Sequence, residues 1–491
     1  MAATSAARAA SDAARRLHTG RILVALTCAS GSFALMQAVI VPALPVVQRE
    51  LGTSTEWAAW TISIYLLSAS VATPLLGRLG DQFGKDRMLL VTLGLFTLGS
   101  VLSIFAWDIS SLIVFRALQG VGGAVYPLSF SIIRDEVPPA RMGVAMGLIS
   151  SMLGLGGGLG LVMSGIIVDH GSWRLLFVVG AVVGLLGIVL VSRFIPSSPQ
   201  RSDATLDIPG ALLLSAGLVC ILVGLTEGRG WGWDSARFLG AIGGGLAILV
   251  VWGWVEARTR QPMVDMRMLA RRPVLFTNLA ALFCGFTMYA IFTVLPLFAQ
   301  MPSGLPPDVA SLVTYGFGAS VTVSALYLLP GALVMLPLGP FGGVLGRKVT
   351  FRIALAIGLL VTALGSAMLA ALHAEPWQLM LGYAVGAGGV AIAFGAMPKL
   401  IADAVSPTET GIATGMNTVV RTVGSVIGSQ AAVTLIASRT IAGTSVPSEA
   451  GFNASLWLGA IAALIAAGFA LAIAPRRSRR REREAVAPSP G

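Results

Sequence analysis

The chain has 491 residues, of which 55% are hydrophobic and 11% charged, and its mean hydropathy is +0.84. Soluble domains carry about 25% charged residues, so this composition excludes an ordinary soluble protein. The apolar residues fall in runs of about 20, the length that an α-helix needs to cross about 30 Å of hydrocarbon. We therefore expect an all-α integral membrane protein, because a helix satisfies its backbone hydrogen bonds within one segment.

Fourteen such runs follow one another along the chain. In chain order, the predicted spans cover residues 22–44, 57–77, 88–106, 110–132, 143–168, 174–192, 208–226, 237–255, 274–298, 320–341, 351–372, 377–400, 410–436 and 453–474. We place both chain ends in the cytoplasm. Arg15, Arg16 and Arg21 precede a first apolar run that is too long for the core of a cleaved signal peptide.

The formal net charge of +11 is compatible with nucleic acid binding, but its distribution points to the membrane. Of the 33 Lys and Arg, 26 fall on the cytoplasmic side. The exceptions lie in outer loops or inside spans: Arg49, Arg174, Arg229, Arg237 and Arg439, and Arg116 and Arg421. This asymmetry follows the positive-inside rule and sets the basic side against anionic lipid headgroups, so we expect no nucleic acid partner.

No catalytic or cofactor chemistry is visible in the sequence. The three cysteines, Cys28, Cys220 and Cys284, lie in predicted spans and form no disulfide framework or metal-ligand cluster. No G-x-x-x-x-G-K-[ST] loop is present for ATP, and no nucleophile lies near a base in a recognisable pattern. We expect neither an enzyme nor a bound metal or cofactor.

A faint internal repeat divides the chain. Gly77, Gly84 and Lys85 after the second span correspond to Gly339, Gly346 and Arg347 after the tenth. The fifth and thirteenth spans share a pattern of small residues: Gly143, Ala145, Gly147, Gly156 and Gly160 match Gly411, Ala413, Gly415, Gly424 and Gly428. Both matches join spans that lie eight apart, which predicts two parallel six-helix halves separated by an inserted pair.

The predicted organisation follows from this repeat. It comprises a cytoplasmic tail (1–21), an N-terminal six-helix bundle (22–193), two inserted helices (207–255), a C-terminal six-helix bundle (274–474) and a basic cytoplasmic tail (475–491). A substrate path is expected between the bundles, near the midplane of the membrane.

Charged residues at the membrane surface and within the spans are the first candidates for function. Asp81 lies in a glycine-rich loop with several bases, and a carboxylate is stabilised near bases and near the positive end of a helix. Arg116 and Arg421 lie inside spans, where an arginine is costly and indicates a functional site unless it anchors neighbouring helices. Asn417 and Arg421 are four residues apart and share one helix face, which we expect to line the cavity.

Several motifs resemble those of the major facilitator superfamily. Gly77-x-Leu79-x-Asp81-x-x-Gly84-Lys85-x-Arg87 is similar to its signature loop. Arg116-x-x-Gln119-Gly120-x-Gly122 looks like its R-x-x-Q-G-x-G motif. Further matches are typical of its fourteen-span drug:proton antiporters: Gly156, Gly160 and Gly165, Trp173-Arg174 with Phe177, and Pro262-Met263-Val264-Asp265-Met266. The resemblance covers residues 22–474.

The resemblance implies roles for these residues. The Asp81 equivalent holds the cytoplasmic helix ends together when the carrier faces outward, with Gly77 and Gly84 in the same loop. Lys85 and Arg87 either share this gating role or only follow the positive-inside rule. Gly156 and Gly160 either give gating flexibility or let helices pack closely. The second half carries Gly343 where the repeat would set an acid, so the latch is expected to be asymmetric.

The sequence departs from this family in its acids. Met36 stands where relatives usually carry an aspartate in the first span, and Val41 replaces an asparagine. Leu161 and Ser164 replace a usual proline and glycine. No acid lies deep in a predicted span, although proton-driven carriers generally need a titratable group in the pathway. Two arginines inside the spans, without a buried acid, favour neutral or anionic amphiphiles over cations as substrates.

We expect a monomeric protein in a bacterial cytoplasmic membrane, in contact with membrane lipids. It is expected to export hydrophobic small molecules by alternating access, with the proton coupling that the resemblance implies. Cavity candidates are Gln37, Tyr65, Arg116, Gln119, Tyr289, Tyr327, Asn417 and Arg421. The tyrosines equally suit helix packing or the membrane interface. Two alternatives remain: a carrier of lipid or of an anionic metabolite with atypical or no proton coupling, and a non-transporting membrane receptor or scaffold.

Overall fold

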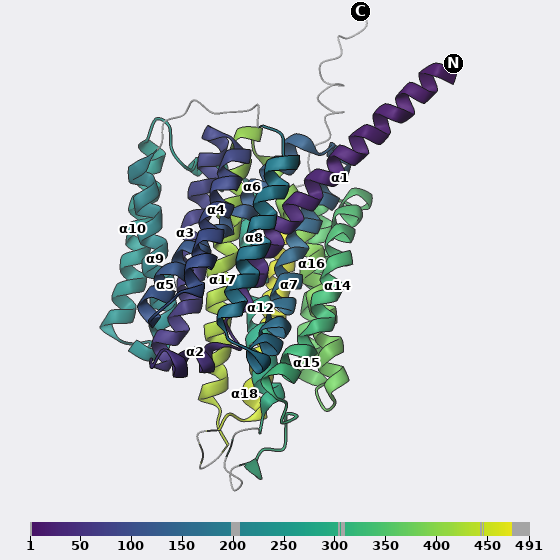
Figure 1. Cartoon of the computed structure of the whole chain (residues 1–491). Helices are drawn as coiled ribbons and strands as arrows, with labels where there is room; N and C mark the ends of the chain where they lie inside the picture. The colour runs from purple at the N-terminus through teal and green to yellow at the C-terminus, as the bar shows by residue number, and fades with distance from the viewer. Residues whose placement is uncertain are drawn as a thin grey trace, which may run out of the picture.

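The computed structural model is helical and elongated along one axis (Figure 1). It describes residues 2–197, 207–302, 305, 310–441, 444 and 446–473, without the side chains of 2–16, 55 and 56. Within these residues, fourteen helices are long and apolar enough to cross a membrane. The predicted all-α, fourteen-span fold is confirmed.

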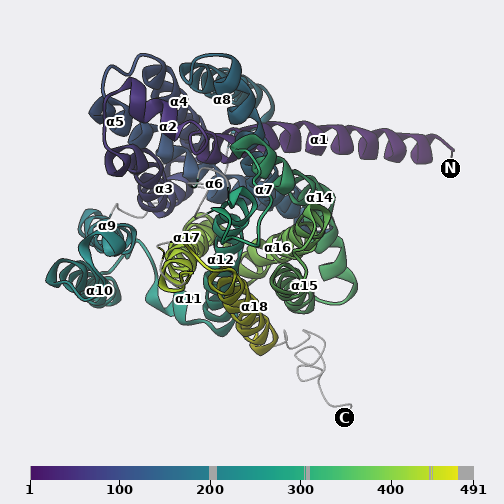
Figure 2. The same ribbon diagram turned by 90° about the horizontal axis from the view of Figure 1, so that it is seen from below.

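The first group of membrane helices packs into one bundle (Figure 2). Its helices are α1 (Ala2–Ala38), α3 (Thr55–Phe83), α4 (Lys85–Ile104), α5 (Ile109–Gly120) continued through η1 (Val121–Ala124) into α6 (Val125–Glu136), α7 (Pro139–His170) and α8 (Arg174–Phe194). A short helix, α2 (Leu44–Glu50), follows α1. The segment predicted as a tail, 1–21, is helical from Ala2 and continuous with the first span.

The second bundle follows an inserted pair. The pair consists of α9 (Ile208–Trp231) and α10 (Ala236–Arg258), and the short helix α11 (Met266–Ala270) leads into the bundle. The bundle contains α12 (Arg272–Gln300), α14 (Val321–Lys348), α15 (Phe351–Ala371), α16 (Pro376–Ala404), η2 (Pro407–Glu409) with α17 (Thr410–Ser438), and α18 (Glu449–Ala472). The predicted tail 475–491 lies outside the described residues.

Local sequence explains several helix ends. Gly84 alone separates α3 from α4, and its φ of +108° suits a residue without a Cβ. Asp108 caps α5 by accepting a hydrogen bond from the backbone N–H of Ser111 at 2.7 Å. This bond and that of the Ser111 hydroxyl hold the pKa of the Asp108 carboxyl below its usual range. Ser54 caps α3 in the same way.

Two pairs of antiparallel helices join the bundles, α7 with α14 and α3 with α17 (Figure 2). We call the face of the molecule where α1 begins and α18 ends the terminal face, and the other end the opposite face (Figure 1). Near the terminal face, glycines bring backbones into contact in both pairs. A Cβ on Gly77 would lie 2.9 Å from the carbonyl oxygen of Gly411, and one on Gly147 only 2.2 Å from that of Gly339.

The two seams differ in length. Along α7 and α14 the contact continues toward the opposite face, where Gly158 packs on Ala332 and Gly165 on Thr322. Between α3 and α17 the glycine contacts occur near the terminal face, with Gly415 against Pro74 as the next one inward. Farther out, both α3 and α17 line a cavity. The bundles are therefore closed at the terminal face and separated on one side beyond it.

The seams also explain the missing second acid. Gly343 occupies the repeat position of Asp81, and a Cβ there would lie 2.3 Å from the carbonyl carbon of Gly143. No side chain fits at that distance, because real Cβ contacts are much longer. The acid on one seam and the glycine on the other are therefore two ways of closing the same face.

Substituting Gly343→Ala should force α14 away from α7 and shift the protein toward a state open at the terminal face. Overpacking of this kind costs about 1–3 kcal/mol, which corresponds to a change of roughly 5- to 150-fold in the conformational equilibrium. Spin labels at the exposed positions Arg87 and Lys348 should show a larger population at long distance. The control is Gly240→Ala, where a Cβ meets nothing within 4 Å; an unchanged distance distribution for Gly343→Ala would contradict the steric closure.

Candidate functional site

A cavity of about 620 Å³ lies between the two bundles. Its lining reaches Pro45, Gln300 and Val321, which are near the opposite face. Toward the terminal face it ends above the glycine contacts of the two seams. The structure therefore holds a chamber that is accessible from the opposite face and closed from the terminal face.

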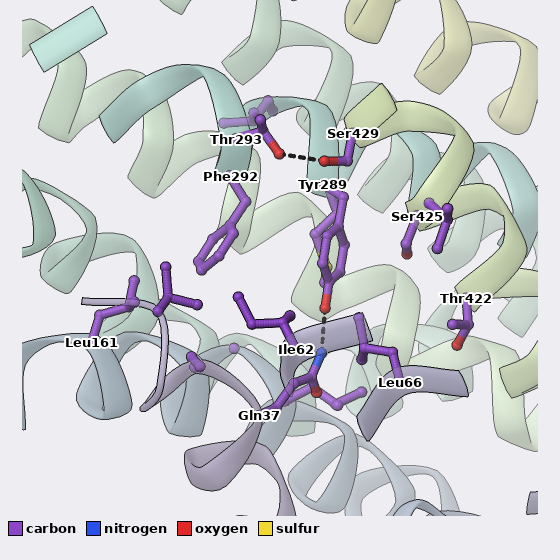
Figure 3. A pocket seen from close by; sticks show the side chains of 18 of the residues that line it. Gln37, Ile62, Leu66, Leu161, Tyr289, Phe292, Thr293, Thr422, Ser425 and Ser429 are labelled. Atoms are coloured by element: carbon purple, nitrogen blue, oxygen red, sulfur yellow. Dashed lines mark hydrogen bonds between the residues drawn. The ribbon is translucent and has the colours of Figure 1, made fainter. Parts of the chain in front are cut away.

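The walls of the cavity are mostly apolar, with polar groups on a few helices. Figure 3 shows Ile62, Leu66, Leu161 and Phe292 around the space. The Gln37 side-chain amide donates to the Tyr289 hydroxyl, and this bond links the two bundles across the cavity. Hydroxyl groups from α12 and α17 lie beside it, with Thr293 and Ser429 2.9 Å apart.

Arg421 is the cation of the cavity. Its guanidinium carbon lies 4.7 Å from the centre of the Phe394 ring. Within the described residues, no oxygen accepts a hydrogen bond from its side chain, and no Asp or Glu lines the cavity. A partly exposed guanidinium in an apolar chamber without a carboxylate attracts anions and repels cations.

Asn417 lies one turn from Arg421 on α17, but its side chain does not line the cavity. Its amide donates a 2.9 Å hydrogen bond to Asn278 of α12, and both side chains are buried. In this conformation, Asn417 ties α17 to α12 inside the second bundle.

Arg116 has a different environment from Arg421. It is completely buried in the first bundle, where it donates to the backbone oxygens of Met36 and Thr61, each at 3.1 Å. It also donates to the side-chain oxygen of Gln119, whose amide donates to Ser100. The network joins α1, α3, α4 and α5, and neither Arg116 nor Gln119 is among the residues that line the cavity.

Two of the three predicted cavity tyrosines also lie away from the lining. Tyr65 covers the Arg116 guanidinium at 4.2 Å and donates to the backbone oxygen of Phe33, which does line the cavity. Tyr327 packs edge-on against Phe317 in the second bundle. Of the predicted residues, this conformation brings Gln37, Tyr289 and Arg421 together at the cavity and keeps the others behind its walls.

Met36, which stands in place of the first-span acid that the resemblance implies, does not face the cavity. Its side chain is buried against α8, where a Cβ on Gly180 would lie 2.8 Å from the Met36 sulfur. An apolar and flexible side chain suits this tight helix contact. In this conformation, Met36 therefore contributes to the packing of α1 on α8.

The predicted latch lies at the terminal face. Asp81 is buried against the first turn of α17, beside Gly411 and Ile412, where the positive end of the helix dipole stabilises a carboxylate. Lys85 is also buried, and it bonds to Asp135 of α6 at 2.5 Å. Arg87 is exposed. The predicted loop is in fact the end of α3, Gly84 and the start of α4, and within it Gly77 and Asp81 contact the second bundle.

Two further arginines, which are not among the predicted site residues, also close this face. Arg134 at the end of α6 donates to the backbone oxygens of Val405 and Ser406, at 2.9 and 3.0 Å. Arg347 at the end of α14 donates to that of Ala140 at 2.7 Å. Both bonds cross from one bundle to the other. The repeat offered a signal for Arg347, because it pairs that residue with Lys85.

Gly156 and Gly160, for which the sequence allows either gating flexibility or close helix packing, pack within the first bundle. A Cβ on Gly160 would lie 2.5 Å from the backbone oxygen of Leu35, and one on Gly156 2.8 Å from the Leu35 nitrogen. Gly158 and Gly154, on another side of α7, face α14 instead. The glycine-rich stretch of α7 therefore fits two helices, α1 in its own bundle and α14 across the seam.

Comparison with known proteins agrees with this architecture. Residues 26–429 match the sequence model of the Major Facilitator Superfamily, and residues 309–490 give a second match. The chain belongs to this superfamily. Among solved structures, the human organic anion transporter MFSD10 is 14% identical over 92% of this chain and 99% of its own, with a TM-score of 0.66. The proton:xylose symporter XylE gives a TM-score of 0.62 at 16% identity, and the match covers 94% of this chain and 97% of XylE.

Curated relatives of this superfamily member are named as resistance and export proteins. Multidrug resistance protein 3 of Bacillus subtilis (strain 168) is 25% identical over 84% of this chain and 79% of its own. The tetracenomycin C resistance and export protein of Streptomyces glaucescens is 25% identical over 83% of this chain and 74% of its own. A multidrug resistance protein B homolog of Mycobacterium tuberculosis (strain ATCC 25618 / H37Rv) is 30% identical over 71% of this chain and 63% of its own. The chain is thus related to multidrug efflux-type transporters.

The two membrane arginines should differ in their effect on stability. Arg116→Met leaves the buried acceptors on Met36, Thr61 and Gln119 without a donor, at a cost of about 1–3 kcal/mol or more. Arg421→Met removes no hydrogen bond from the described structure and should leave stability nearly unchanged. Thermal unfolding of the purified variants in one detergent measures the difference; equal losses of Tm would contradict the assignment of Arg116 as the anchor.

Proposed function

We propose that the protein exports hydrophobic small molecules across a bacterial cytoplasmic membrane by alternating access. The observation that carries this proposal is the apolar chamber of about 620 Å³, which is reached from the opposite face and closed at the terminal face. The excess of Lys and Arg favours a cytoplasmic terminal face. The described conformation is then the one that faces outward and releases substrate.

The charge of the chamber supports neutral or anionic amphiphiles as substrates. Arg421 offers a guanidinium without a carboxylate partner, beside the aromatic rings of Phe394 and Tyr289. Hydroxyl groups of Thr422 and Ser425 in the lining add polar contacts next to it. A lipophilic cation would find no acid in the lining, so it would gain apolar contact but also meet a like charge. The relatives named for multidrug resistance and for tetracenomycin C resistance and export support drug export.

Proton coupling remains part of the proposal, through groups outside the lining. Asp81 closes the terminal face with its charge at the start of α17, so protonation would weaken that contact. Asp169, at the end of α7, accepts a 3.2 Å hydrogen bond from the Thr322 hydroxyl of α14, across the other seam. These two carboxyl groups lie at opposite ends of the bundle interface, where loss of charge would favour opposite movements.

A carrier of an anionic metabolite is the second candidate function, and the same unpartnered guanidinium of Arg421 favours it. It differs from multidrug export in selectivity. A single anion that competes out all other ligands of the purified protein would favour this alternative.

Binding of two probes of the same shape and opposite charge tests the substrate class. The purified protein should bind tetraphenylborate at least tenfold more tightly than tetraphenylphosphonium, and Arg421→Ala should remove most of this preference. Arg421→Lys should retain part of it, because the charge persists but the planar fork is lost. The control is Arg439→Ala in an outer loop; tighter binding of the cation by the unmodified protein would exclude an anion-selective chamber.

Proton coupling is tested by substrate-driven proton flux in proteoliposomes. We expect flux in the unmodified protein, a loss of more than tenfold in Asp81→Asn, and a smaller change in Asp169→Asn. The neutral Asn keeps the shape of the side chain and removes the charge. Absence of flux in the unmodified protein, with substrate transport retained, would reject antiport.

A further inference from the structure

The inserted helix α9 forms part of the cavity wall. Leu222 and Thr226 of α9 line the chamber together with residues of α3, such as Ile62 and Ser63, and of α17, such as Val426. The inserted pair is thus more than an appendage on the lipid side of the bundles. Figure 2 shows α9 standing beside α3 and α17, with α10 outside it.

The position of α9 corresponds to the gap between α3 and α17. These two helices touch through Gly77 and Gly411 near the terminal face, and beyond that point both line the cavity. On the other side of the molecule, α7 and α14 stay in contact through Gly158 and Gly165. On one side of the chamber the two bundles therefore do not meet, and α9 covers that side.

The terminal-face half of α9 is firmly held. Leu214 and Leu218 belong to an apolar cluster with Met416 of α17 and Val264 of the segment before α11. The buried carboxylate of Glu256 on α10 accepts from the Trp252 indole at 3.0 Å and from the Val264 backbone at 3.3 Å. The side chain of Arg78 on α3 donates to the backbone oxygen of Pro262 at 3.4 Å.

The cavity half of α9 has only apolar and van der Waals contacts with the bundles. Among the residues that the structure describes, no hydrogen bond or ion pair joins α9 to α3 or to α17. Separation there would break no polar interaction, and lipid tails could replace the lost contacts at little cost. A helix held at one end and loosely packed at the other can swing outward at the loose end.

We propose that α9 is a lateral door of the substrate site, through which amphiphiles dissolved in the membrane exchange with the cavity. This inference rests on the proposed transport function and specifies the route of its substrates. Leu222 and Thr226 are then the door residues that a passing molecule meets. The chemistry of the opening suits an apolar molecule with a single polar or anionic end, because the wall there is apolar and Arg421 lies in the same chamber.

Cross-linking α9 to each bundle separately tests the door. In a background without the three native cysteines, Thr226→Cys is combined with Ser63→Cys on α3 or with Val426→Cys on α17, and a short bifunctional thiol reagent joins each pair. Transport of 1-anilinonaphthalene-8-sulfonate is measured in proteoliposomes before cross-linking, after it, and after reductive cleavage. Each variant before cross-linking is its own reference.

We expect both cross-links to reduce transport at least tenfold and reduction to restore it, since a door must move relative to both bundles. If either cross-link leaves transport unchanged, α9 travels with that bundle and the door is excluded. A control cross-link inside the inserted pair uses a background that lacks Cys28 and Cys284 but keeps Cys220, and joins Cys220 to Gly245→Cys, where a Cβ would lie 3.1 Å from that of Cys220. It should leave transport intact; a loss there would mean that the pair must deform internally, which also contradicts the door.

The proposed function and the door fail in different ways. Binding of the same probe to the purified protein in detergent should survive both cross-links, because detergent solution gives access from the opposite face. A protein that neither binds nor transports the probe before cross-linking would contradict the proposed function, and the door with it. Transport that persists in either cross-linked variant would contradict the door alone.

Discussion

Direct contact between glycine backbones at the terminal face is the constraint on which the rest of the structure depends. Helices in lipid gain little from the hydrophobic effect when they associate, so close van der Waals contact and hydrogen bonds must hold them. The contacts of Gly77 with Gly411 and of Gly147 with Gly339 bring the bundles together at one end. The cavity, the buried Asp81 and the bonds of Arg134 and Arg347 all follow from that closure.

Hydropathy alone predicted the number and order of the membrane helices, because each span is a long apolar run. It could not predict which face of a glycine-rich helix meets which neighbour. Gly156 and Gly158 are two residues apart in α7, yet the first packs on α1 and the second on α14. Small residues permit close approach to any helix, so only the packed structure assigns the partner.

The two arginines illustrate the same limit for the candidate site. In the sequence, Arg116 and Arg421 are alike, because each is a base inside a predicted span. In the structure, backbone oxygens of α1 and α3 surround Arg116, whereas an aromatic ring and open space surround Arg421. The cost of an unpartnered charge in lipid indicates that a residue matters, but it does not distinguish an anchor from a ligand-facing group.

The unequal lengths of the two seams have a mechanical consequence. Contact along α7 and α14 runs through most of the membrane, so the bundles separate most easily on the α3 and α17 side, by a rocking rotation that keeps α7 and α14 in contact. Displacement under such a rotation grows with distance from the axis, and α10 lies at the far edge (Figure 2). In the proposed transport cycle, opening and closing would therefore displace more lipid around the inserted pair than anywhere else, and the rate of the cycle would be sensitive to lateral pressure in the bilayer.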